Sequence, residues 1–113
     1  MSPTFFATAA ELRRWLEKHH AEARELLVGF HKRESGRPSL TWPESVDEAL
    51  CFGWIDGVRR RIDDASYSIR FTPRRTGSVW SAVNIAKVEK LEQEGRMTEA
   101  GRIAFARRRE NRS

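Results

Sequence analysis

Long hydrophobic runs and cysteine pairs are missing from this 113-residue sequence. No apolar run approaches the roughly 20 residues that span a bilayer, and no basic segment precedes an apolar block near the N-terminus. We therefore expect neither a membrane helix nor a secretory signal. The single cysteine, Cys51, has no partner within the chain, which favours a reducing compartment. These absences predict a cytoplasmic protein.

Patterns typical of catalysis or metal binding are also scarce. The sequence has no glycine-rich phosphate loop and no spacing that suggests a Ser-His-Asp set. His19 and His20 are adjacent, so on a helix they would point about 100° apart, and no cysteine or acidic residue lies at a zinc-like spacing. His31 is a weak candidate for acid/base work. We expect no catalytic residue, metal or cofactor, although these patterns leave an enzyme open.

The composition is that of a soluble globular protein with a heavily charged surface. Hydrophobic residues make up 39 % and charged residues 33 %, and 113 residues suit one compact domain over residues 1–113. The charge is uneven: residues 1–56 carry 7 basic and 9 acidic side chains, whereas residues 57–113 carry 14 and 7, giving −2 and +7. Arginine supplies 17 of the 21 basic residues, which permits anion binding; a codon bias explains the same count.

Local signals predict four helices and a small sheet. Two capping boxes, Thr8 with Glu11 and Thr41 with Glu44, begin the first two helices, and Gly53 provides a left-handed stop for the second. The remaining predicted elements are a strand at 25–32, a hairpin at 58–71 with its turn at 63–66, a third helix capped by Ser78 and ended by Gly95, and a fourth capped by Thr98. The predicted fold is α+β, with an antiparallel three- to four-stranded sheet packed by about four helices. The predicted single core comprises Trp15, Leu50, Ile69, Phe71, Trp80 and Leu91.

Strand alternation in the hairpin predicts an arginine face. It places Arg59, Arg61 and Arg70 on one face, and the loop that follows adds Arg74 and Arg75. The opposite, inward face would comprise Val58, Ile62, Tyr67, Ile69 and Phe71. The five arginines are candidate anion-binding residues, and the alternative is a solvated face neutralised by carboxylates. The group lacks interleaved exposed aromatics, so binding of a polyanion such as nucleic acid should be weak and non-specific.

Four other residues are candidates for a pocket or for structural polar contacts. Trp54 and Asp56 belong to the predicted turn after the second helix, and Trp80 and Asn84 share an apolar face of the third. A polar Asn84 within that stripe predicts either a hydrogen bond to backbone near the Gly53–Gly57 turn, which we favour, or a place in a ligand site. The polar tail 107–113 is predicted to fray.

Several ordered motifs resemble the YdeI/OmpD-associated family of bacterial proteins, also called bacteriocin-protection proteins. They are Thr41-Trp42-Pro43-Glu44, Cys51-Phe52-Gly53-Trp54-Ile55-Asp56-Gly57, Arg70-Phe71-Thr72-Pro73-Arg74, Trp80-Ser81-Ala82-Val83-Asn84 and Glu94-Gly95-Arg96-Met97-Thr98-Glu99-Ala100-Gly101. The resemblance implies a link to survival against cationic antimicrobial peptides and implies no catalytic residue. Chains of that family commonly continue into a second basic helical segment, so this is either a short natural form or a chain cut after Ser113.

The expectation from the sequence is a non-enzymatic module of a bacterial stress or antimicrobial-peptide resistance system with an anion-binding arginine face. One alternative is a small enzyme acting on an anionic metabolite in a cleft between the hairpin and the third helix. Another is an interaction or homo-oligomerisation module that uses an exposed Trp42 or Trp54. The sequence names no ligand or partner.

Overall fold

The computed structural model describes residues 2–109 and has the predicted α+β fold, with four α-helices and a four-stranded sheet. The sheet order is β1-β2-β4-β3. Its strands are β1 (Thr4–Phe5), β2 (Leu26–His31), β3 (Trp54–Asp63) and β4 (Ser66–Pro73). The helices are α1 (Ala9–His19), α2 (Trp42–Cys51), α3 (Ala82–Gln93) and α4 (Glu99–Ala106), and a short 3₁₀ turn, η1 (Arg33–Ser35), follows β2. The sheet is mixed rather than antiparallel, because the short β1, which the sequence did not predict, pairs in parallel with β2.

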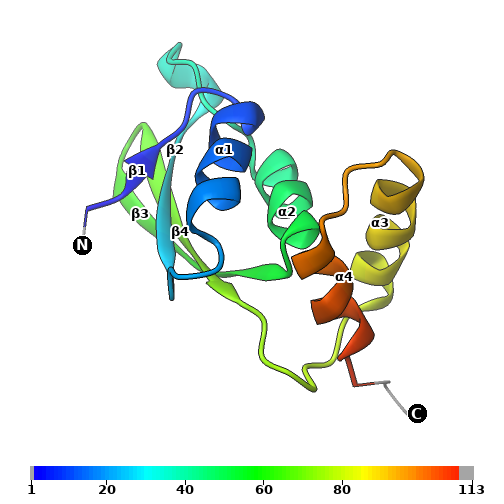
Figure 1. The fold of residues 1–113 in the computed structure, drawn as a ribbon. Coiled ribbons are helices and arrows are strands. Elements are labelled where there is room, and N and C mark those ends of the chain that lie inside the picture. The colour runs from blue at the N-terminus through cyan, green and yellow to red at the C-terminus, as the bar shows by residue number, and fades with distance from the viewer. Residues whose placement is uncertain (1, 110–113) are drawn as a thin grey trace.

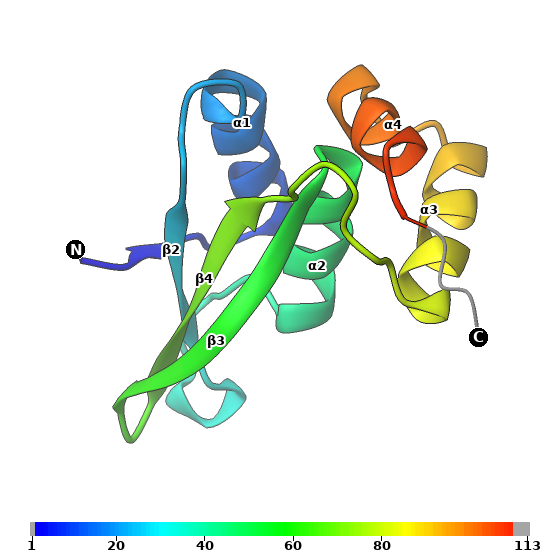
Figure 2. The ribbon, with the colours of Figure 1, turned by 90° about the horizontal axis from the view of Figure 1, so that it is seen from below.

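The molecule is built in layers (Figure 1). Helices α1 and α2 lie over one face of the sheet, and α3 and α4 lie on the far side of α2 from the sheet (Figure 2). No helix of residues 2–109 is long and apolar enough to cross a membrane.

The helices begin and end where local chemistry directs. Thr8, Thr41 and Thr98 each accept a backbone N–H three residues ahead, so these three predicted caps are confirmed. Gly53 and Gly95 follow α2 and α3 with φ of 75° and 71°, the left-handed conformation that favours glycine.

The predicted start of the third helix was wrong. Ser81, not Ser78, caps α3 by accepting the N–H of Asn84. The three residues before it are held as a loop: the carbonyl of Ser78 accepts the N–H of Arg109, and the Trp80 ring is buried in the core. A helix that began at Ser78 would require those residues to turn helical.

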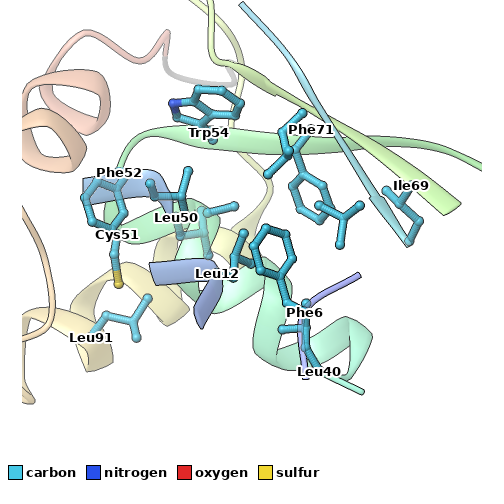
Figure 3. Close-up of a cluster of buried hydrophobic side chains, with 14 of the residues drawn as sticks. Phe6, Leu12, Leu40, Leu50, Cys51, Phe52, Trp54, Ile69, Phe71 and Leu91 are labelled. Carbon is cyan, nitrogen blue, oxygen red and sulfur yellow. The ribbon is translucent and has the colours of Figure 1, made fainter. Parts of the chain in front are cut away.

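The core has the predicted members, of which Figure 3 labels Leu50, Ile69, Phe71 and Leu91. Leu50, Ile69, Phe71, Trp80 and Leu91 are buried, and Trp15 packs against them. Leu26 of β2 lies opposite Phe71 of β4, and Val28 lies opposite Ile69, so these apolar pairs form the sheet's contribution beneath the helices. Trp54 is only 1 % exposed, which contradicts its use as an exposed oligomerisation residue.

The C-terminal tail is tied down as far as the structure describes it. The carbonyl of Arg107 accepts the N–H of Gly77 at 2.9 Å, and Arg109 bonds to Ser78. The predicted fraying is therefore wrong for residues 107–109, because the loop before α3 supplies their backbone partners. Residues 110–113, the rest of that prediction, lie outside the described residues.

Candidate functional site: a basic groove

An open groove of about 920 Å³ lies at the end of the sheet that carries the β3–β4 turn. One wall is the connection from β2 to α2, residues 31–43, and the other is formed by Arg59 and Tyr67 of the hairpin. Figure 2 shows this connection beside the far end of the hairpin. The N–H of Lys32 donates to the carbonyl of Ala65 at 2.8 Å, which fixes the connection to the hairpin turn.

A three-layer stack positions Arg59 in the groove. The rings of Phe30 and Tyr67 stack with centroids 5.0 Å apart and 9° between their planes. The guanidinium carbon of Arg59 lies 3.8 Å from the centroid of the Tyr67 ring. An aromatic face attracts a cation without neutralising its charge. The Tyr67 ring therefore holds Arg59 in place although the arginine side chain is exposed. Its fork of donors therefore stays available for a ligand.

The groove is electropositive. Its lining includes four cations that form no ion pair within residues 2–109: Lys32, Arg33, Arg37 and Arg59. Glu34 is the single carboxylate among the lining residues. Like charges on a shared surface repel one another unless anions intervene, so this arrangement favours an anionic ligand.

Trp42 adds an exposed aromatic surface at the groove. Its side chain is 49 % exposed at the start of α2, and its indole Nε1 donates to Oδ2 of Asp56 at 3.2 Å. Asp56 is thus a structural polar residue that orients an aromatic ring toward the groove. The sequence had assigned Asp56 to a pocket or to structural polar contacts, and it had assigned no aromatic to the arginine surface.

The predicted arginine face is wrong in its register. Arg59 and Arg61 pair with Ile69 and Tyr67, so they share the helix-facing side of the sheet, whereas Arg70 points to the other side, where it pairs with Glu25 at 3.2 Å. Arg60 lies opposite Ser68 and shares the face of Arg70. Val58 and Ile62, expected inward, are exposed.

The physical reason is a β-bulge. Between the pairs Asp56–Phe71 and Arg59–Ile69, β3 advances three residues while β4 advances two, so Gly57 and Val58 both lie opposite Arg70. The extra residue reverses the alternation from Arg59 to Arg61, after which a second irregularity lies between Arg61 and Asp63. A Cβ on Gly57 would approach the Arg70 carbonyl oxygen to 2.9 Å, so this position favours glycine. An isolated glycine within a strand pattern is the signal that could have predicted the bulge.

The five predicted arginines therefore divide between four environments, one of which is the pair of Arg70 with Glu25. Arg59 lines the groove, and Arg61 pairs with Asp64 beside the hairpin turn. The same turn is closed by Asp63, whose carboxylate accepts from the Ala65 N–H and the Ser66 hydroxyl; these bonds lower its pKa. Arg74 and Arg75 lie at the opposite end of the hairpin, in a separate pocket with Trp54.

Asn84 does not make the hydrogen bond that we favoured. It lies in the first turn of α3, half-buried, and its side chain forms no hydrogen bond in the part of the chain that the structure describes. Asn84 shares a helix face with the buried Val88 and Leu91, but its place in the first turn of α3 leaves it only half-buried.

We expect Asn84→Ala to change the free energy of unfolding by no more than about 0.5 kcal/mol, because no buried partner is lost. Urea denaturation of both proteins checks this. A loss above about 1 kcal/mol would point to a buried amide contact and contradict the observed placement.

In the part of the chain that the structure describes, the groove contains neither a metal site nor a cysteine. Within residues 2–109, no group of three or more His, Cys, Asp and Glu side chains is placed to hold a metal ion. Cys51 is fully buried, and burial raises the pKa of its thiol, which keeps it protonated and shielded. What the groove offers is therefore a set of charged and aromatic contacts.

One known protein family matches most of the chain. A family described as a domain of unknown function, DUF8412, matches residues 4–104. The chain belongs to the DUF8412 family. The matched part includes both walls of the groove, the hairpin and most of α4. No curated protein and no solved structure matched this DUF8412 chain.

Proposed function

We propose that the protein is a non-enzymatic cytoplasmic module that binds a phosphate-rich polymer, with single-stranded nucleic acid as its ligand, in the basic groove. The observation that carries this proposal is a set of four cations, without an ion pair in the described part of the chain, beside an exposed tryptophan. A positive groove that follows the backbone, combined with aromatic rings for the bases, is the general design of proteins that bind single strands without sequence preference.

Geometry favours a single strand over a duplex. The outer face of the Arg59 guanidinium, backed by Tyr67, is a flat cationic surface on which a base can stack, and Trp42 offers a second one. Stacking needs unpaired bases, so a duplex would use the cations alone. The resemblance to the YdeI/OmpD-associated family supports placing this activity in a bacterial stress or antimicrobial-peptide resistance system.

Salt should weaken the binding steeply. Four phosphate contacts to a single strand predict a slope of about −2.8 in log affinity against log salt, or a loss of roughly 50-fold between about 50 and 200 mM. Fluorescence anisotropy of a labelled 20-nucleotide oligothymidylate measures this directly. Absence of binding at the lower salt concentration would end the proposal.

Adjacent arginines on opposite faces provide a matched pair of variants. Arg59→Glu and Arg60→Glu each change the net charge by two units, but only Arg59 lines the groove. We expect Arg59→Glu to weaken binding at least about tenfold and Arg60→Glu less than about threefold, because long-range charge is screened beyond about 10 Å in 0.1 M salt. Equal weakening by both variants would mean that net charge, not the groove, determines binding.

A further inference from the structure

A second pocket lies at the other end of the hairpin from the basic groove. It has a volume of about 310 Å³ and lies between the end of α1, the turn from α2 into β3, the loop after β4, and α4. Figure 2 shows that loop passing from the β4 end toward α3. We call this second pocket the donor pocket. Its lining residues include Phe52, Trp54, Arg74, Arg75, Ile103 and Arg107.

Two residues that line this pocket each carry a buried N–H donor without a hydrogen-bond partner in residues 2–109. Trp54 is 1 % exposed, and its indole Nε1 forms no hydrogen bond within residues 2–109; the same holds for the buried Nε of Arg74. Figure 3 shows the indole nitrogen at the end of the Trp54 ring farther from Phe71. A buried donor without an acceptor is destabilising, so two such donors on residues of one pocket indicate a place for an acceptor.

The fold holds Arg74 in this position. Its backbone N–H donates to the carbonyl of Gly53 at 2.9 Å, which fastens the loop to the turn that precedes Trp54. Its guanidinium carbon lies 3.9 Å from the centroid of the Trp80 ring. Burial lowers the pKa of Arg74, and the charge of Asp56 opposes that effect without forming an ion pair in the described residues. The Arg74 guanidinium is thus held in position, partly desolvated, and has no ion pair within residues 2–109.

The lining selects the ligand's chemistry. Among the described residues, no carboxylate lines the donor pocket, whereas Arg75 and Arg107 add positive charge and Phe52 and Ile103 add apolar wall. A ligand must therefore bring acceptors and negative charge together with an apolar body. Two unpaired N–H groups match the two oxygens of a carboxylate better than the three oxygens of a phosphate.

We propose that the donor pocket binds a small monocarboxylate with an apolar body, whose oxygens accept from Trp54 Nε1 and Arg74 Nε. This site is separate from the basic groove and independent of the function proposed for it. A ligand here would join the turn after α2 to the loop before α3 and to α4.

Nuclear magnetic resonance of the indole N–H groups tests the proposal. The four tryptophans give four indole signals, and comparison with conservative Trp→Phe variants assigns them. We expect phenylacetate to shift the Trp54 signal saturably and the uncharged phenylacetamide to have no effect at equal concentration. Equal effects of the two compounds, or no shift with phenylacetate at tens of millimolar, would overturn the proposal. A shift with phenyl phosphate but none with phenylacetate would overturn the carboxylate assignment.

Neighbouring arginines again supply the control. Arg74→Gln should weaken phenylacetate binding at least about tenfold, as expected for loss of a charge-assisted hydrogen bond. Arg75→Gln removes the same charge from an exposed position and should weaken it less than about threefold. Arg59→Glu should leave phenylacetate binding unchanged, so a failure of the nucleic-acid proposal is distinguishable from a failure here. Equal losses in the Arg74 and Arg75 variants would contradict the assigned contact.

Discussion

Replacing Glu48 with alanine is expected to destabilise the protein by about 3–5 kcal/mol. Glu48 is 5 % exposed on α2, and its two carboxylate oxygens accept from Arg13 of α1 at 3.0 Å and from Arg96 of the α3–α4 connection at 2.7 Å. Arg13 also donates to the backbone carbonyl of Arg96 at 2.9 Å. Removing the carboxylate leaves Arg13 without an ion pair among the described residues and leaves Arg96 with only the more exposed Glu94. The expected loss is a large part of a small domain's stability.

The chain offers a matched control for this effect. Glu94 pairs with the same Arg96 at 3.2 Å, but its side chain is far more exposed. Because exposed pairs contribute little, Glu94→Ala should cost less than about 1 kcal/mol. Urea denaturation gives the free energy of unfolding of both variants. If Glu48→Ala costs no more than Glu94→Ala, the buried ion network does not hold the helices together.

The second large effect is expected at Phe71, where truncation to alanine should cost about 3–5 kcal/mol. Phe71 is buried on β4, opposite Leu26 of β2, at the point where the sheet meets the helices. The loss combines the transfer free energy of the ring with the cavity that the neighbouring side chains cannot fill.

Val58 provides the comparison that tests the register of the hairpin. Alternation in the sequence placed it inward with Phe71, whereas the bulge leaves it 66 % exposed. Val58→Ala should therefore change stability by no more than about 0.5 kcal/mol, in contrast to Phe71→Ala. Thermal unfolding of the two variants measures the difference. A fall of several degrees in the melting temperature of Val58→Ala would support the register without the bulge.

Residues that act through their immediate neighbours were predictable from the sequence. Thr41 and Glu44 satisfy each other's backbone groups within one turn, and Gly53 ends α2 through its own backbone conformation. The core residues followed because periodicity alone selects the inward face of a regular element.

What the sequence could not supply depends on long-range geometry. Glu48 looks like any charged residue of an amphipathic helix, and its partners lie 35 and 48 residues away. Trp42 reaches the groove only because the connection after β2 folds back beside the hairpin. The arginines of β3 were assigned to the wrong sides because one extra residue in the strand reverses the positions from Arg59 to Arg61.

The bulge at Gly57 and Val58 determines which arginine of β3 faces the groove. Closing the bulge without a deletion would restore strict alternation, place Val58 opposite Ile69 and Arg60 opposite Tyr67, and turn Arg59 to the side that Arg60 now occupies. Deleting one of the two bulge residues would instead leave Arg59 opposite Ile69. The charge of the groove therefore tolerates a one-codon deletion at the bulge but not a slip of the strand by one residue.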